Sequence, residues 1–325
     1  MNTASTTRLK HHDARTQPPL SLKSHRPRDT AVGAAHYGGR VGIGSWGHVD
    51  GLPVLDRSLV MGVVNVTPDS FSDGGEWFEP AAAIKHGREL LAEGADLLDV
   101  GGESTRPGAV RPAPAEEIRR VLPVIETLAA EGALISVDTM RSEIAALALD
   151  AGAAMINDVS GGQADPDMLA LVAERRTPYV CMHWRGHSID MQNKAEYGDV
   201  VAEVIAELGE RIEVMRAAGV DLDRVALDPG LGFAKNADHN WEILRRLPEF
   251  AVLGRPLLIG ASRKAFLGRL LADEQTGEPR PAVRRDDASA AVTALAAAAG
   301  AWCIRAHAVA PSVDAVRVAK RWGTV

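Results

Sequence analysis

Acidic and amide side chains stand at the ends of short apolar runs in this sequence. Asp138, Asn157 and Asp228 each close such a run, and Lys264 follows another. A carboxylate can accept two parallel N–H hydrogen bonds, and an amide both donates and accepts, so this set suits the edge of a flat heterocycle such as an aminopyrimidinone. Lys264 adds a donor for a ring carbonyl or nitrogen. These four residues predict a binding site for a base-like ring.

A second group of residues is cationic or neutral and rich in N–H donors. Arg305 and His307 lie at the end of the last apolar run, Asn65 closes the first run, and Arg106 lies in the loop after the second. Such donors suit phosphate oxygens. We therefore predict a site with an acidic end and a basic end, for a substrate with a base-like ring and an anionic leaving group.

The elements that must carry these residues alternate regularly. Short apolar runs are separated by stretches with the hydrophobic period of a helix. The apolar runs cover residues 59–65, 96–101, 133–138, 154–157, 179–183, 225–228, 257–260 and 302–306. The helix-like stretches cover residues 80–93, 115–130, 141–150, 166–175, 200–218, 240–246, 288–299 and 311–321.

Eight such units with short connections predict a closed (β/α)8 TIM barrel, more than an open doubly wound sheet. Barrel enzymes place their catalytic residues at the carboxyl ends of the strands, which is where the polar residues above fall. A single Asp after a strand is often only a cap for the next helix. Polar residues after every strand at once indicate an active site.

The domain organisation follows from length and composition. A chain of 325 residues fits one barrel of about 250 residues with additions. We predict a single catalytic domain over residues 51–325 and a disordered tail over residues 1–50. The tail holds five of the ten histidines and shows no apolar periodicity.

Charge and cysteine content exclude several classes of protein. The net charge is 36 − 43 = −7, which disfavours a nucleic-acid binder. No apolar stretch reaches the roughly 20 residues that span a bilayer, so no membrane association is expected. Cys181 and Cys303 lie inside apolar runs, which predicts buried thiols without a disulfide and a cytoplasmic location.

Two polar, glycine-bearing loops follow the first two apolar runs: NVTPDSFSDGG (65–75) and GGESTRPG (101–108). Such loops often act as lids. Asp73 and Arg106 carry opposite charges and can pair when the lids close, with Phe71 and Pro107 as apolar walls. The alternatives are that Asp73 caps a local turn and that Phe71 tucks back onto the barrel.

Seven motifs in order resemble one family. They are the two loops above with SVDT (136–139), NDVSGG (157–162), DPGLGF (228–233), SRKAF (262–266) and RAH (305–307). From about Leu59 to Trp322 the chain resembles the dihydropteroate synthases of folate biosynthesis. The resemblance implies a transferase that joins 6-hydroxymethyl-7,8-dihydropterin pyrophosphate to p-aminobenzoate and releases pyrophosphate.

The resemblance also implies roles for single residues. The pterin-binding set matches Asp138, Asn157, Met182, Asp228 and Lys264. Arg305 and His307 match the pyrophosphate site, and Asn65 the residue near Mg²⁺. The p-aminobenzoate side, where sulfonamide inhibitors also bind, matches Thr105, Arg106, Phe233 and Ser262. Of these residues, Arg106, Lys264, Arg305 and His307 are the expected catalytic groups, together with Asp73.

Further implications are a Mg²⁺ cofactor, small-molecule substrates as the partners and a homodimer. The chain departs from the family pattern at Ala234, where a second glycine is common, and at Ala265 and Ala308. None of these positions carries an assigned chemical role. Two alternatives stay open: a methyltetrahydrofolate-binding methyltransferase barrel and a catalytically inactive pterin-binding paralogue.

Overall fold

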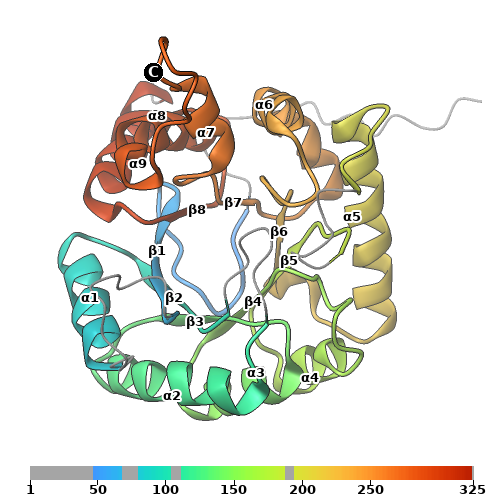
Figure 1. Ribbon diagram of the computed structural model, residues 1–325. Helices are drawn as coiled ribbons and strands as arrows, with labels where there is room; N and C mark the ends of the chain where they lie inside the picture. Colours follow the sequence, from blue (N-terminus) through green and yellow to red (C-terminus); the bar gives the residue numbers. More distant parts are fainter. Residues whose placement is uncertain (1–46, 68–79, 104–110, 187–193, 324–325) are drawn as a thin grey trace, which may run out of the picture. The chain divides into compact units, whose positions relative to one another are not determined.

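A computed structural model describes residues 47–67, 80–103, 111–186 and 194–323. Eight parallel strands form one sheet in the order β6-β5-β4-β3-β2-β1-β8-β7. A parallel bridge between Leu227 and Leu257 connects β6 with the chain just before β7, so the sheet curls into a nearly closed barrel (Figure 1). The strands are β1 (Leu59–Asn65), β2 (Leu97–Gly101), β3 (Ile135–Asp138), β4 (Met155–Asp158), β5 (Tyr179–Met182), β6 (Val225–Asp228), β7 (Leu258–Ile259) and β8 (Cys303–Ala306).

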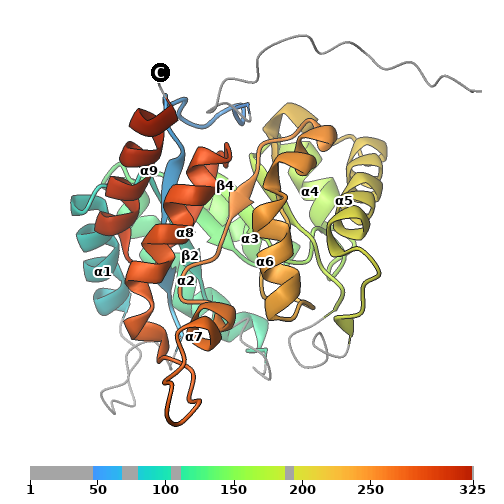
Figure 2. The same cartoon turned by 90° about the horizontal axis from the view of Figure 1, so that it is seen from above.

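Helices surround the barrel, and α8 and α9 lie side by side in that ring (Figures 1 and 2). They are α1 (Pro80–Ala92), α2 (Pro114–Ala130), α3 (Ser142–Asp150), α4 (Met168–Arg175), α5 (Val200–Ala217), α6 (Ala237–Arg245), α7 (Ala265–Leu270), α8 (Asp286–Ala298) and α9 (Val309–Gly323). The predicted (β/α)8 TIM barrel is confirmed.

The chain after β7 departs from the expected pattern. No helix is predicted from the sequence at α7, which covers only six residues and is too short to display a helical period. Short 3₁₀ turns are also present at Leu222–Arg224, Leu247–Leu253 and Ala282–Arg284. The β7 strand itself keeps two residues of the run expected over 257–260.

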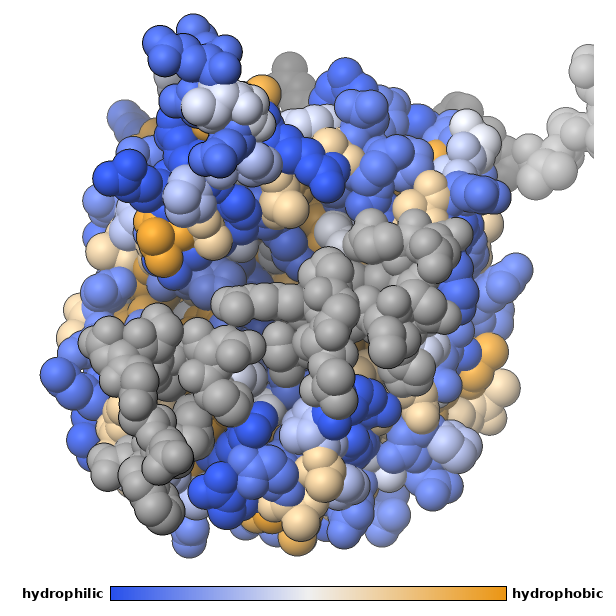
Figure 3. Space-filling view, in the orientation of Figure 1, coloured by the Kyte–Doolittle hydropathy of each residue, from blue (hydrophilic) through white to orange (hydrophobic). Residues whose placement is uncertain are grey.

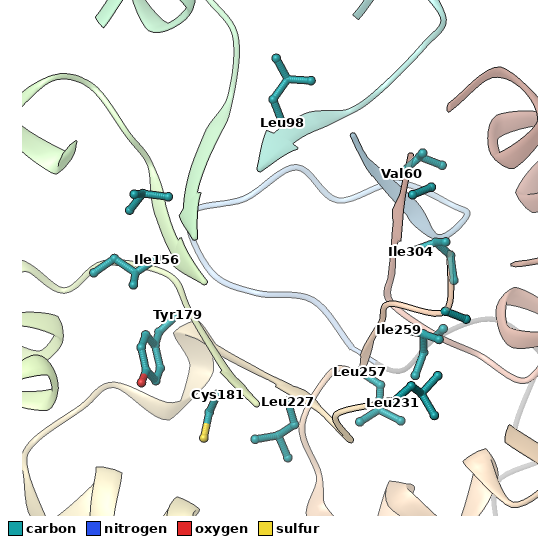
Figure 4. Packing of buried hydrophobic residues seen from close by; sticks show 14 of the residues in the cluster. Val60, Leu98, Ile156, Tyr179, Cys181, Leu227, Leu231, Leu257, Ile259 and Ile304 are labelled. Carbon is teal, nitrogen blue, oxygen red and sulfur yellow. The ribbon is translucent and has the colours of Figure 1, made fainter. Parts of the chain in front are cut away.

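The two-residue period of the strands separates two sets of side chains. One set points away from the barrel axis and packs against the helices, as Val60, Leu98, Ile156, Tyr179 and Ile304 do in Figure 4. These side chains are at most 3% exposed. They form the large core between sheet and helices, which holds the strands in place around the interior.

The other set faces the barrel interior and changes character along the strands. A separate hydrophobic cluster, here called the apolar layer, fills the interior near the amino ends of the strands. It consists of Val49, Leu52, Leu59, Met61, Leu97, Met155, Val180, Ala226, Leu258, Trp302 and Cys303. Two residues further along several of these strands, the inward side chain is polar or charged: Asp99, Asn157, Asp228 and Arg305.

The predicted boundary of the tail at residue 50 is wrong. Val49 is 1% exposed and Leu52 is 7% exposed, and both belong to the apolar layer. The Asp50 N–H also donates to the Asp223 carbonyl at 2.9 Å. This short segment shows no periodicity, because it closes the amino end of the barrel as irregular chain. The prediction for residues 1–46 lies outside the described residues.

The two cysteines are buried and free, as predicted. Burial raises the pKa of the Cys181 thiol to about 12, so it carries no thiolate at neutral pH. Among the described residues, no helix is both long enough and apolar enough to cross a membrane. In the view of Figure 3 most of the coloured surface is hydrophilic, with scattered hydrophobic residues.

Candidate active site

The described members of the predicted site all lie at the carboxyl ends of the strands or directly after them. Asn65, Asp138, Met182 and Asp228 each end a strand, and Asn157 and Arg305 stand one residue before a strand end. The members that follow a strand are Phe233 after β6, Ser262 and Lys264 after β7, and His307 after β8. Asp73, Thr105 and Arg106, with Phe71 and Pro107, lie outside the described residues.

Arg305 joins two carboxylates inside the barrel. Its Nε donates to Asp99 Oδ2 at 2.6 Å and its Nη2 donates to Asp138 Oδ2 at 2.8 Å. The Asn157 amide donates to the same oxygen of Asp99 at 2.9 Å. The expected separation of an acidic end from a basic end is therefore wrong at this point, because Arg305 is part of the acidic network.

Asp99 is a site residue that the sequence analysis missed. It is fully buried, and its Oδ1 has no hydrogen-bond partner among the described residues. The signal was present, since Asp99 interrupts an apolar run at an inward position. A buried carboxylate oxygen without a partner is costly, so a ligand N–H at this position would be favourable.

We name the group Asp99, Asp138, Asn157, Asp228 and Arg305 the polar layer. Burial and the neighbouring charge of Asp99 raise the pKa of Asp138 to about 8, against the opposing effect of Arg305. Burial likewise raises the pKa of Asp228, although the Gly230 N–H donates to its Oδ1 at 2.7 Å. Burial is the largest cause of both shifts, so they indicate a desolvated site.

Lys264 supplies the second cation of this site. Burial lowers the pKa of its ammonium group to about 8, while Asp228 opposes the shift. Three carboxyl groups, those of Asp99, Asp138 and Asp228, thus share the site with the two basic groups of Arg305 and Lys264. The site is therefore suited to a ligand that brings N–H donors or positive charge.

An apolar wall stands beside the charged groups. Met182 is 2% exposed and clusters with Met140 and Val159, and Phe233 packs against this cluster. The Lys264 ammonium lies 4.3 Å from the centre of the Phe233 ring, within the range of a cation–π contact. A flat ring held by the polar layer would find both an apolar surface and hydrogen-bond partners here.

His307 and Ser262 are hydrogen-bonded to each other. The Ser262 hydroxyl oxygen lies 3.1 Å from the His307 backbone nitrogen and 3.1 Å from its Nδ1. Burial and the charge of Arg305 lower the pKa of His307 to about 3, so the imidazole is neutral at pH 7. If Ser262 accepts the backbone N–H and donates to Nδ1, the ring proton stands on Nε2, ready for an anion.

A second buried network was also missed. Glu117, on α2, is fully buried and accepts the Thr139 hydroxyl at 2.6 Å and a hydrogen bond from Arg141. Glu103, at the end of the β2 segment, pairs with Arg111 at 2.8 Å and with Arg141 at 3.6 Å. Sequence spacing gave no signal for this network, because its members come from α2, from the chain just before it and from the segments after β2 and β3, and they meet only through tertiary packing.

The described residues contain no group of three or more His, Cys, Asp or Glu side chains that could hold a metal ion. Mg²⁺ often binds through few protein ligands, with waters and substrate phosphates completing its shell. Asn65, half-buried at the end of β1, offers one amide oxygen for that purpose. Within the described residues, the donor set fits an ion that arrives with a pyrophosphate and offers no metal site made of protein ligands alone.

Comparison with known proteins identifies the family. Residues 61–307 match the family described as pterin binding enzyme. A dihydropteroate synthase of Mycobacterium leprae is 52% identical over 264 residues, which cover 81% of this chain and 93% of that protein. The chain belongs to the dihydropteroate synthase family.

Solved structures of this family agree. The dihydropteroate synthase of Xanthomonas albilineans with 4-aminobenzoic acid has a TM-score of 0.76 and 46% identity, covering 83% of this chain and 94% of that chain. A structure of the same synthase with 7,8-dihydropteroate has a TM-score of 0.74 and 44% identity, covering 84% of this chain and 96% of that one.

The enzyme is thus a transferase of folate biosynthesis. It condenses 6-hydroxymethyl-7,8-dihydropterin pyrophosphate with p-aminobenzoate to give 7,8-dihydropteroate and pyrophosphate. This activity agrees with the prediction from the motifs, and the methyltransferase alternative receives no support from these relatives.

Proposed function

We propose that the polar layer and Lys264 bind the pterin ring of the substrate. The observation that supports this most directly is the buried carboxylate group around Arg305, with an unpartnered oxygen on Asp99. The aminopyrimidinone edge of a pterin presents several N–H donors. Asp138, Asp228 and Asn157 can accept from them, and Met182 lines the apolar side.

The leaving pyrophosphate meets cationic and neutral hydrogen-bond donors, which also lie at the carboxyl ends of the strands. Arg305 uses two of its five N–H groups on carboxylates and keeps others for a phosphate oxygen. His307 Nε2–H and the Asn65 amide add neutral donors. Mg²⁺ held by Asn65 and the pyrophosphate would neutralise charge on the leaving group.

The reaction then proceeds with departure before attack. The bond between the pterin methylene and the pyrophosphate oxygen breaks, and its electron pair leaves with pyrophosphate. The carboxyl oxygens of Asp99, Asp138 and Asp228 favour the cationic methylene that remains. The neutral arylamine of p-aminobenzoate forms the C–N bond and releases its proton to solvent or pyrophosphate, so His307 needs no role as a base.

The p-aminobenzoate side is assigned to Phe233 and Ser262, with Thr105, Arg106 and Asp73 from the two loops. The Phe233 ring lies beside the Lys264 ammonium group, which supports placing the aromatic ring of p-aminobenzoate near both. Ser262 lies beside His307 at the same rim. The roles of the three loop residues rest on the family motifs alone.

A pyrophosphate-release assay tests this assignment. The pterin pyrophosphate is supplied with and without p-aminobenzoate, and both pyrophosphate and 7,8-dihydropteroate are measured. Release that depends on p-aminobenzoate is the expected result. A protein that binds pterin and releases no pyrophosphate would instead be the inactive paralogue.

We also propose a cytoplasmic homodimer. Two buried free thiols agree with a reducing compartment. Large apolar side chains are exposed on α8 and α9, where Leu295 is 71%, Val318 60% and Trp322 81% exposed, and they are a candidate contact surface. Sedimentation should give the mass of a dimer, and Trp322→Glu should shift it toward the monomer if α9 takes part.

A further inference from the structure

A chain of hydrogen bonds lies beside the polar layer and leads from the loop after β6, through the end of β5, to α5. The Lys235 ammonium lies 2.9 Å from His183 Nδ1 and 3.2 Å from the Phe233 carbonyl oxygen. On the other side of the imidazole, His183 Nε2 lies 2.8 Å from Glu207 Oε2. Lys235 and His183 are 3% and 2% exposed, so the contact between them is shielded from water, whereas the Glu207 side chain is 36% exposed.

The charges set the direction of each hydrogen bond. An ammonium group can only donate, so His183 Nδ1 accepts from Lys235, and the ring proton stands on Nε2 and is donated to Glu207. Burial lowers the pKa of His183 to about 4 and that of Lys235 to about 7. Between those pH values the imidazole is neutral and the lysine is charged, as this direction requires.

The segment that Lys235 closes is the loop over residues 229–236, between β6 and α6. Its backbone turns through positive φ at Gly230 (71°) and Ala234 (47°), so it cannot continue a strand ladder. A backbone hydrogen bond from the Phe233 N–H to the Gly230 carbonyl oxygen (3.1 Å) holds it together with side-chain contacts. The Gly232 N–H donates to Asn240 Oδ1 at 2.7 Å, and Lys235 donates to the carbonyl of Phe233.

The same loop is in close contact with His183 on one side and with the pterin-facing residues on the other. A Cβ atom on Gly230 would lie 2.5 Å from the His183 carbonyl oxygen. Asp228 begins the loop and accepts the Gly230 N–H, and the Phe233 ring meets Lys264. A displacement of Lys235 would therefore reach both Asp228 and Phe233.

Burial of a charged lysine lowers stability unless its hydrogen bonds compensate. We propose that Glu207, His183 and Lys235 form a positioning chain that fixes the Phe233 carbonyl and so holds Asp228 and Phe233 in place around the pterin ring. This inference rests on the pterin-binding role proposed for Asp228. The three residues act through the loop and do not contact the substrate themselves.

Two substitutions of His183 form a matched test. In His183→Asn the side-chain oxygen can replace Nδ1 as the acceptor from Lys235, but the donor to Glu207 is lost. In His183→Gln the amide can replace Nε2 as the donor to Glu207, but the acceptor for Lys235 is lost. Both variants remove the same imidazole from the same buried position, so the two substitutions should change the stability of the fold by similar amounts.

The measurement is calorimetric binding of 6-hydroxymethyl-7,8-dihydropterin, with Tm recorded for each variant. We expect His183→Gln and Lys235→Met to raise the Kd about tenfold, the value of one buried hydrogen bond, and His183→Asn to raise it less than about threefold. Equal affinities for the Asn and Gln variants, or an unchanged Kd in Lys235→Met, would overturn the proposal.

The Asp228→Ala variant distinguishes a failure of this inference from a failure of the proposed pterin site. If Asp228→Ala weakens binding and Lys235→Met does not, only the positioning chain is wrong. If Asp228→Ala also binds normally, the pterin site itself is misassigned. If the variants do not fold, ¹⁵N NMR spectra of the wild-type His183 imidazole between pH 4 and pH 7 test the proposal. The positioning chain requires the ring proton on Nε2, so a proton on Nδ1 would contradict it.

Discussion

The two halves of the barrel interior are built from the same strands and have opposite chemistry. The apolar layer consists of hydrophobic side chains, among them Met61, Leu97 and Trp302. The polar layer, two residues further along, holds three carboxylates and one guanidinium. On β2 the change occurs between Leu97 and Asp99, and on β8 between Cys303 and Arg305.

The difference separates stability from function. Side chains in the apolar layer gain free energy by leaving water, so the amino end of the barrel stabilises the fold. The polar layer carries raised carboxyl pKa values and an oxygen without a partner, which both lower stability. A ligand that donates hydrogen bonds to these buried carboxyl groups can compensate the unfavourable electrostatic free energy of the free enzyme.

The largest expected effect concerns the apolar layer. Met61 is fully buried, and Met61→Ala should lower the free energy of unfolding by about 3 kcal/mol through lost burial and a cavity. Urea denaturation measures this change. The Kd for the pterin should stay within twofold at a temperature where the variant is folded. A large loss of affinity would mean that the two layers are coupled.

Asp228→Ala should have the opposite profile. Loss of a charged acceptor should weaken pterin binding by about 3 kcal/mol, more than 100-fold in Kd. Because the buried carboxyl has a raised pKa, its removal should leave Tm unchanged or increase it. Calorimetry and thermal unfolding give the two values, and Asp238→Ala, an exposed residue on α6, is the control. A strongly lowered Tm would contradict the division of roles.

Acid should destabilise the polar end through His307. Its folded pKa of about 3 lies below the ordinary value of 6.5. A depressed pKa means that the unfolded chain binds the proton first, so the contribution to stability is present above pH 6.5 and is lost as the pH falls toward 3. Urea unfolding of His307→Asn should therefore lose less stability over that range than the wild type. Identical slopes would show that His307 titrates normally.

The smallest expected effect is at Ala234, in the loop that follows β6. Ala234 has φ 47° where the family often has glycine, and this left-handed conformation costs an alanine about 1 kcal/mol. Ala234→Gly should stabilise by up to about 0.5 kcal/mol, since the greater freedom of unfolded glycine offsets part of the gain. The matched control is Ala145→Gly inside α3, which should destabilise by about 1 kcal/mol. Destabilisation by Ala234→Gly would show that its methyl group packs usefully.

Much of this enzyme could be predicted from its sequence. The alternation of apolar runs and helical periods is a local property, because period two and period 3.6 follow from backbone geometry. The β1 and β6 bounds agree with the predicted 59–65 and 225–228. Polar residues at the strand ends predicted the active-site face of the barrel, because parallel strands of one barrel end on the same face. The seven motifs then indicated the chemistry.

Tertiary structure alone decided which polar groups meet. Arg305 and Asp99 are 206 residues apart, and their ion pair depends on barrel closure through β8 and β1. The same holds for Lys235 with His183 and for Glu117 with Arg141, where burial turns ordinary side chains into coupled groups. Val49 showed no local pattern, because its place depends on the open amino end that it fills. Spacing along a chain encodes faces and periods, whereas pairing and desolvation across strands arise only once the barrel has formed.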